Sequence, residues 1–334
     1  MRARLVARRR RTLAILVAVA AVVGLYVVVP QLAGAEQTWQ RIRDGSPAWL
    51  LGAAVLEAAS FGGYIWLLRV VAAPLAWRDA LQITLAGVAA TRIVTVAGAG
   101  GIAVTIAGLR RGGLTTREAA ERQAIDLVVL YAVFFGLMVL DGLVLAVLGG
   151  RHAGLTVVPA LLGATIIGLA GAMALVPGSF ERALRRRLGR RFGAIGAVPG
   201  VVAAGMRGAL VLARRRERGL AGALAWWVFD VAALWASVRA FGGSVAPPEL
   251  LMAYLVGHAF NVLPVPGGVG PVEGGMIAAL VAFGEPAGLA LVGVLSYQVV
   301  SVWLPALPGA LALVRLRRMK PATEGPRPES VSAR

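Results

Sequence analysis

The chain has 334 residues, of which 58% are hydrophobic and 15% are charged, and its formal net charge is +18. A soluble domain has about 25% charged residues, so this composition excludes a water-facing surface over most of the chain and predicts one polytopic membrane domain. The absence of cysteine and the presence of only two histidines exclude disulfides, thiolate metal sites and histidine-rich metal sites. We therefore expect no metal and no cofactor.

The positive charge comes almost entirely from arginine, because Lys320 is the only lysine. The arginines cluster in the gaps between apolar runs, and this placement is typical of membrane orientation. Proteins that read phosphate backbones need a large solvated basic surface. The pattern therefore predicts a basic cytoplasmic N-terminus at residues 1–11 and no nucleic-acid partner.

Six apolar runs are long enough to cross a bilayer core of about 30 Å, which takes about 20 helical residues. The first run ends at Pro30, and no small-residue cleavage site precedes Gln31, so we favour a membrane span over a signal peptide. The six runs are Thr12–Val29, Pro47–Leu68, Ala124–Leu148, Gly154–Val176, Leu220–Phe241 and Ala287–Val314.

Two further apolar regions, Asp79–Leu109 and Pro248–Phe283, are interrupted near their middle by glycine and proline. Proline removes a backbone donor and glycine adds flexibility, so each region predicts two half-helices around a non-helical break. The second region is too long for one span and too short for two, which favours a re-entrant hairpin. The break residues are Gly98, Gly100 and Gly101 in the first region, and Pro264, Pro266, Gly267, Gly268 and Gly270 in the second.

The unit span–hairpin–span then occurs twice, at residues 47–148 and 220–314, with opposite orientations. Most of the arginines fall on one side of the membrane if both termini are cytoplasmic. Inverted-topology repeats are typical of secondary transporters, whose sites lie at broken helices near the midplane. We expect an all-α polytopic membrane protein with about six full spans and two re-entrant hairpins in a single domain, residues 12–316. Full crossing by both hairpins remains the alternative.

The segment 179–219 between the repeats is rich in arginine with interleaved apolar residues. Helices that lie at the cytoplasmic interface on anionic lipid would explain this pattern, and so would a basic loop that only fixes the topology. A further span across Gly193–Ala213 is disfavoured by Pro199 and Arg207. Residues 317–334 are rich in proline, glutamate and serine, and this composition predicts a disordered cytoplasmic tail.

Ionisable side chains at membrane depth cost about 2.5–3.5 kcal/mol on insertion scales, so each needs a partner or a wet cavity. Such residues, together with polar ones in apolar stretches, are Glu57, Arg92, Asp126, Asp141, Asp230, Arg239, His258, Asn261, Glu273, Tyr297 and Gln298. For binding a lipid headgroup we select Arg92, Arg122, Asp126, Asn261 and Glu273.

These candidates also have structural interpretations. Glu273 follows the second break, where a carboxylate either caps free N–H groups or contacts a headgroup. Arg92 precedes the first break and either holds a phosphate with its fork of donors or forms an internal ion pair. Arg122 and Asp126 are four residues apart, so an ion pair along one helix is the alternative to headgroup binding. No catalytic constellation is recognised.

Two segments carry a family resemblance. The stretches RRGGLTTREAAERQAID (Arg110–Asp126) and NVLPVPGGVGPVE (Asn261–Glu273) resemble the patterns R-x-G-x-s…A…ER-x-x-D and P-x-P-G-G-x-G-x-x-E of the lysylphosphatidylglycerol synthase transmembrane-domain family. The similarity extends over residues 12–316. Members of this family resemble lipid flippases, so the resemblance implies lipid translocation. It assigns motif roles to Arg122, Asp126, Pro266, Gly267, Gly268, Gly270 and Glu273. In contrast to the bifunctional members, we expect the chain to lack the soluble aminoacyl-transferase domain, since nothing of that size follows Val314 in the sequence.

The sequence therefore predicts a non-enzymatic lipid translocase of the cell membrane that moves a phospholipid or a polyprenyl-linked headgroup between leaflets. Its expected partners are membrane lipids with anionic headgroups. The alternative is a membrane-embedded transferase, or an accessory subunit that partners an enzyme of cell-envelope lipid or glycan synthesis. The lipid, the direction of movement, the energy source and the oligomeric state remain open.

Overall fold

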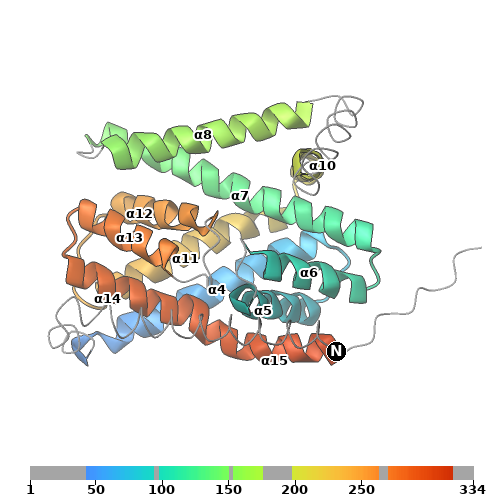
Figure 1. Ribbon diagram of the computed structural model, residues 1–334, viewed down its shortest axis with the longest axis horizontal. Coiled ribbons are helices and arrows are strands. Elements are labelled where there is room, and N and C mark those ends of the chain that lie inside the picture. The colour runs from blue at the N-terminus through green and yellow to red at the C-terminus, as the bar shows by residue number, and fades with distance from the viewer. Residues whose placement is uncertain (1–42, 94–97, 150–152, 176–197, 263–269, 319–334) are drawn as a thin grey trace, which may run out of the picture.

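The computed structural model describes residues 43–93, 98–149, 153–175, 198–262 and 270–318. Within these ranges the chain folds into helices and contains no strand (Figure 1). The helices are α4 (Pro47–Val71), α5 (Trp77–Ile93), α6 (Ala99–Arg111), α7 (Thr116–Val147), α8 (Ala153–Leu175), α10 (Val198–Arg214), η3 (Arg218–Leu220), α11 (Ala221–Arg239), α12 (Pro247–Ala259), η4 (Phe260–Val262), α13 (Pro271–Ala282), α14 (Ala287–Gln298), η5 (Val299–Trp303) and α15 (Leu304–Arg318). The predicted span Thr12–Val29, the basic segment 1–11 and tail residues 319–334 lie outside the described residues.

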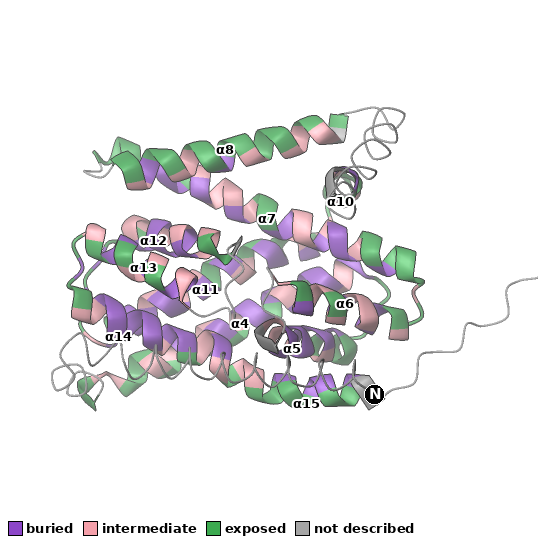
Figure 2. Ribbon diagram, viewed as in Figure 1, coloured by how far each residue is buried: buried purple, intermediate pink, exposed green. Residues whose placement is uncertain are grey.

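The described part of the chain holds five helices that are long and apolar enough to cross a membrane, namely Pro47–Val71, Thr116–Val147, Ala153–Met173, Arg218–Arg239 and Ala287–Leu316. Each of them contains most of one predicted span, which confirms an all-α polytopic membrane protein. Figure 2 shows exposed positions along α8 and buried ones where α4, α11 and α14 meet. The exposed side chains of α8 include Val158, Leu161 and Leu169. Such an apolar outer face is suited to lipid rather than to water.

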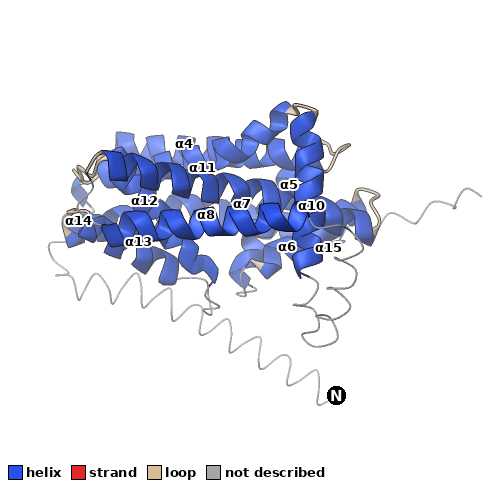
Figure 3. Cartoon of the chain, turned by 90° about the horizontal axis from the view of Figure 1, so that it is seen from above, coloured by secondary structure: helices blue, strands red, loops and turns tan. Residues whose placement is uncertain are grey.

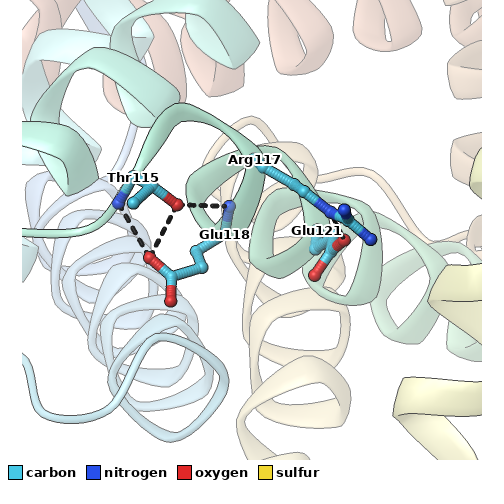
Figure 4. A network of polar contacts seen from close by, with 4 residues as sticks. All are labelled: Thr115, Arg117, Glu118 and Glu121. Atoms are coloured by element: carbon cyan, nitrogen blue, oxygen red, sulfur yellow. Dashed lines mark hydrogen bonds and ion pairs between the residues drawn. The ribbon is translucent and has the colours of Figure 1, made fainter. Parts of the chain in front are cut away.

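Helix α7 begins at Thr116, well before the apolar run predicted from Ala124. A capping box explains the earlier start (Figure 4): the Thr115 hydroxyl accepts from the Glu118 N–H, and the Glu118 carboxylate accepts from the Thr115 N–H at 2.8 Å. These reciprocal bonds satisfy two backbone donors at the helix N-terminus. From the first turn to the second, the exposed side chains of Arg117 and Glu121 form an ion pair at 2.9 Å. The apolar run thus marks the part of α7 suited to the bilayer, and the charged first turns extend the helix.

Helices α4 and α11, the first spans of the two repeats, pack side by side and antiparallel (Figure 1). The Ser46 N–H donates to the Ala240 carbonyl at 2.9 Å where α4 begins and α11 ends. Toward the other end, Gly63 faces Gly222 so closely that a methyl group on either would collide with the backbone of the other. Small residues permit this close approach of two membrane helices. The α4–α11 pair therefore forms the centre of the bundle.

Two helix pairs, α5–α6 and α12–α13, enter the bundle from opposite ends (Figure 1). Helices α6, α12 and α13 have 13, 13 and 12 residues, or about 20 Å each at 1.5 Å per residue, which is short of a bilayer core of about 30 Å. These lengths fit the predicted half-helices. Each pair also packs against the last long helix of the other repeat, since α5 contacts α15 and α12 contacts α7.

Helix α10 covers the C-terminal part of the arginine-rich segment 179–219. It lies across α7 and α8 rather than along them, as the two perpendicular views agree (Figures 1 and 3). Gly205 and Gly208 allow its close contact with Ala124 and Ile125 of α7. This orientation is expected of a helix that lies at a membrane interface. An interfacial helix was one of the two interpretations of this segment from the sequence. Residues 179–197 lie outside the described part of the segment.

Candidate functional site

The first hairpin turns between Ile93, the last residue of α5, and Ala99, the first residue of α6. Gly98 precedes α6 with φ 73°, a left-handed conformation that favours glycine. Gly100 and Gly101 belong to the first turn of α6, where Gly101 lies against α5: a Cβ atom there would be 2.6 Å from the Thr91 hydroxyl oxygen. Of the three predicted break residues, only Gly98 therefore lies outside α6, and Gly101 serves the contact between α6 and α5. Residues 94–97 and the Arg92 side chain lie outside the described residues.

The second hairpin leaves α12 through the 3₁₀ turn η4 and resumes at Pro271 in α13. Gly270 has φ 124°, which places it in the region open to glycine. A Cβ atom on Gly275 would be 2.6 Å from the Phe260 ring and 3.1 Å from the Cα of Gly257, so α12 and α13 approach closely near the turn. The predicted break residues Pro264, Pro266, Gly267 and Gly268 lie outside the described residues. Asn261 lies in η4 and is exposed.

Glu273 is buried at the start of α13. Its carboxylate accepts a hydrogen bond from the Gly270 N–H at 2.7 Å. This contact is one half of a capping box, and the other half is missing because glycine has no side chain. The sequence left Glu273 as either a helix cap or a headgroup contact, and the structure shows the hydrogen bond of a helix cap. A contact between Glu273 and a headgroup remains a prediction.

We expect Glu273→Ala to lower the free energy of unfolding by about 1 kcal/mol, since a cap is worth about 0.5–2 kcal/mol. Glu273→Gln retains an acceptor oxygen for the Gly270 N–H, so a cap alone predicts nearly full rescue of the thermal midpoint of the detergent-solubilised protein. Rescued stability combined with lost lipid movement in Glu273→Gln would instead show that the negative charge itself is required.

Asp126 lies fully buried between α7 and α4. Its Oδ2 atom accepts from the Tyr64 hydroxyl at 3.1 Å and from the Gln123 amide at 3.4 Å. Arg122 turns away from it and donates to the Val71 carbonyl at 2.9 Å, at the C-terminal end of α4. The ion pair considered between Arg122 and Asp126 is therefore not formed, because a helix terminus offers the arginine a free carbonyl. Both selected residues contact helix packing partners in this structure.

The sequence did not predict that the densest group of buried polar contacts in the described bundle would come together. The Asp230 carboxylate accepts from the Tyr254 hydroxyl at 2.5 Å and from the Tyr297 hydroxyl at 2.6 Å. Glu57 of α4 lies at the level of Asp230 in the antiparallel α4–α11 pair. We call Glu57, Asp230, Tyr254 and Tyr297 the carboxyl cluster.

The antiparallel register of α4 and α11 could have revealed this cluster. Ser46 meets Ala240 at one end and Gly63 faces Gly222 toward the other, so Glu57 and Asp230 face each other about halfway along both helices. Hydropathy identifies each carboxyl group as unusual but does not say which helices pack together. Among the residues that the structure describes, no group of three or more histidine, aspartate or glutamate side chains could hold a metal ion.

A pocket of about 470 Å³ opens between the C-terminal end of α7, the start of α12 and the end of α13. Its walls include apolar side chains such as Leu145 and Phe283, together with the polar Thr156 and Glu249. This mixture suits a molecule with both apolar and polar parts. The pocket lies at the open end of the second hairpin, away from the capped start of α13.

Comparison with known proteins agrees with the two motifs and the helical architecture. Among curated proteins, no match is found. The family described as the lysylphosphatidylglycerol synthase TM region matches residues 13–309, which include every described helix up to the first turns of α15. Because this match covers most of the chain, the protein belongs to the lysylphosphatidylglycerol synthase TM region family.

Proposed function

We propose that the protein is a lipid translocase of the cell membrane, which moves a phospholipid or a polyprenyl-linked lipid between leaflets without chemical change. The observation that carries this proposal is the pair of short helix hairpins that enter a bundle of spanning helices from opposite ends. Broken helices of this kind form the binding sites of secondary transporters near the membrane midplane. Membership of a family named for lysylphosphatidylglycerol supports a lipid as the cargo.

The hairpin turns offer complementary groups for a headgroup. Helix α6 begins with no acidic residue in its first turn and no side-chain cap at Gly98, so its N-terminus is suited to a phosphate. Arg92, at the end of α5, is the predicted second phosphate contact. Helix α13, by contrast, is capped by Glu273. In the second hairpin, exposed Phe260 and Asn261 precede the turn and offer one apolar and one polar contact.

The pocket at the open end of α12–α13 supports a route for the headgroup on one side of the membrane. It is large enough for a phosphorylated headgroup and carries Glu249 and Thr156 among apolar walls. In the proposed topology both termini are cytoplasmic, so this pocket faces outside and the charged start of α7 faces the cytoplasm. Acyl chains would stay in the bilayer, against the apolar outer faces of the helices.

A leaflet assay tests the proposal. The purified chain is reconstituted into vesicles that carry a fluorescent phospholipid, and a membrane-impermeant quencher reports which leaflet holds the label. We expect the quenched fraction to rise from about half, the outer-leaflet share, to nearly all within the assay, whereas protein-free vesicles stay near half. Unchanged leaflet exchange for every major envelope phospholipid and for a polyprenyl phosphate would overturn the proposal and favour an accessory or transferase role.

A further inference from the structure

The carboxyl cluster places two acidic groups against each other in the interior of the bundle. Glu57 and Asp230 are each only 5% exposed, and they face each other across the antiparallel contact of α4 with α11. Among the described residues, no arginine forms an ion pair with either group. Two carboxylates that are buried opposite each other without a positive partner cannot both be ionised. The pair therefore holds at least one proton.

The hydrogen bonds indicate which carboxyl group carries that proton. Both oxygens of Asp230 accept from phenol hydroxyls, one from Tyr254 and one from Tyr297, and donors of this kind favour the ionised form. The Oε2 atom of Glu57 is buried and has no hydrogen-bond partner. The hydrogen-bond pattern therefore favours Glu57 over Asp230 as the proton carrier of the pair.

The same contacts disfavour a bound metal cation. A cation such as sodium or calcium needs several oxygen ligands converging on one point. Here the Asp230 oxygens are already bonded to two hydroxyls, and the described residues contain no group of three acidic or histidine side chains around a common centre. A single proton fits the cluster without any rearrangement.

Titratable groups on the neighbouring helices face the Glu57–Asp230 pair. Tyr254 and His258 come from α12, and Tyr297 comes from α14. Asp126 of α7 is linked to α4 through Tyr64, two turns from Glu57. Of these groups, His258 is half-buried and lies between Tyr254 and the end of the hairpin arm.

Helix α12 connects the cluster to the second hairpin. Tyr254 donates to Asp230, while its ring stacks on the His258 ring with 4.1 Å between centroids. His258 lies one turn before Asn261, at the end of the hairpin arm. When Glu57 loses its proton, two adjacent negative charges must be separated or hydrated, and the Tyr254 contact transmits this change to α12.

We infer that Glu57 and Asp230 form a proton-binding site that loads and releases one proton as the hairpin α12–α13 moves, so that a proton gradient drives lipid movement. This inference rests on the proposed lipid translocation. In each cycle an O–H bond forms on Glu57 with a proton from water on one side of the membrane. The same bond breaks when the proton passes to water on the other side.

Vesicles with an imposed pH difference test the coupling. For one proton per lipid, a gradient of one pH unit can shift the leaflet ratio by up to about tenfold. We expect the wild-type chain to show such a shift, and Glu57→Gln and Asp230→Asn, which remove the titrating pair at nearly constant shape, to equilibrate lipid with no response to the gradient. Glu121→Gln removes an exposed carboxylate and should respond like the wild type.

An infrared titration of the purified chain tests the proton site independently of transport. The wild-type chain should show a protonated carboxyl band that bleaches as pH rises, Glu57→Gln should lack it, and Glu285→Gln, altered at a separate buried carboxyl group, should retain it. If Glu57→Gln does not fold, Tyr297→Phe replaces it; the loss of one donor to Asp230 should shift the pH at which the band bleaches.

The outcomes separate the two proposals. Suppose the wild-type chain moves lipid but the leaflet ratio does not change with the pH gradient, or changes with a sodium gradient instead. Proton coupling is then overturned, and lipid translocation stands. If no lipid moves under any gradient, the proposed function fails and proton-driven movement fails with it. In that case a bleaching band specific to Glu57 still supports the proton-binding site, and its absence overturns the site as well.

Discussion

Gly63→Leu is expected to give the largest loss of stability of any single substitution considered for this chain. A Cβ atom on Gly63 would lie 2.8 Å from the Ala225 Cβ, 2.9 Å from the Gly222 carbonyl oxygen and 3.0 Å from the Trp226 nitrogen. Two of these three atoms belong to the backbone of α11 and cannot turn aside as a side chain would. Overpacking a core costs about 1–3 kcal/mol, and we expect the upper end or beyond, measured as the thermal midpoint in detergent.

The neighbouring glycine supplies the control. Gly62 is exposed, and a Cβ atom there would meet nothing within 4 Å. Gly62→Leu makes the same chemical change in the same helix turn, and we expect its free energy of unfolding to stay within about 0.5 kcal/mol of the wild type. Equal midpoints for the two variants would show that α4 and α11 do not pack as closely as described.

Gly275→Leu is expected to give a large loss of lipid movement, by about tenfold or more. A Cβ atom on Gly275 would lie 2.6 Å from the Phe260 ring and 3.1 Å from the Gly257 Cα, so a leucine forces α12 and α13 apart beside their turn. The proposed headgroup contact at Asn261 depends on this geometry, and a displacement of about 1 Å can cost a hundredfold in a positioned site. The measurement is the rate of leaflet exchange in reconstituted vesicles.

Gly274→Leu is the matched control because a Cβ atom on Gly274 meets nothing within 4 Å. Both variants add the same side chain to consecutive positions of α13, so insertion and helix propensity change equally. We expect near wild-type exchange for Gly274→Leu and an unchanged elution volume for both proteins. If both variants exchange lipid at the wild-type rate, close packing of the hairpin arms is unnecessary and the site lies elsewhere.

Much of the architecture could be predicted because membrane spans leave a strong signal in hydropathy. The predicted run Pro47–Leu68 lies within α4, and the run Leu220–Phe241 overlaps η3 and α11. Boundaries were less predictable wherever capping rather than apolar length determines them. The capping box of Thr115 and Glu118 places the start of α7 at Thr116, before the predicted run begins at Ala124. Hydropathy reports where a helix meets lipid, whereas backbone hydrogen bonds decide where it begins.

The candidate site was less predictable because it depends on which helices meet. Arg122 and Asp126 carry the family motif, yet they contact Val71 and Tyr64 within the helical packing. Glu57 and Asp230 were recognised as costly charges, but their pairing follows from the close α4–α11 contact, which glycine permits. A pattern in one helix cannot report a partner 173 positions away. Pairing the first spans of the two repeats in antiparallel register supplies that missing information.

The interlocked arrangement of the repeats has a consequence for how the chain is assembled during synthesis. Helix α5 packs against α15, where Gly309 approaches the Leu85 carbonyl and Leu313 joins Ala86 and Ala90 in one apolar cluster. The ribosome makes the first hairpin early, but the helix that covers it follows every other described helix in the chain. The first hairpin therefore waits in the membrane with one face against lipid or an insertion factor. The bundle closes only when α15 has left the ribosome.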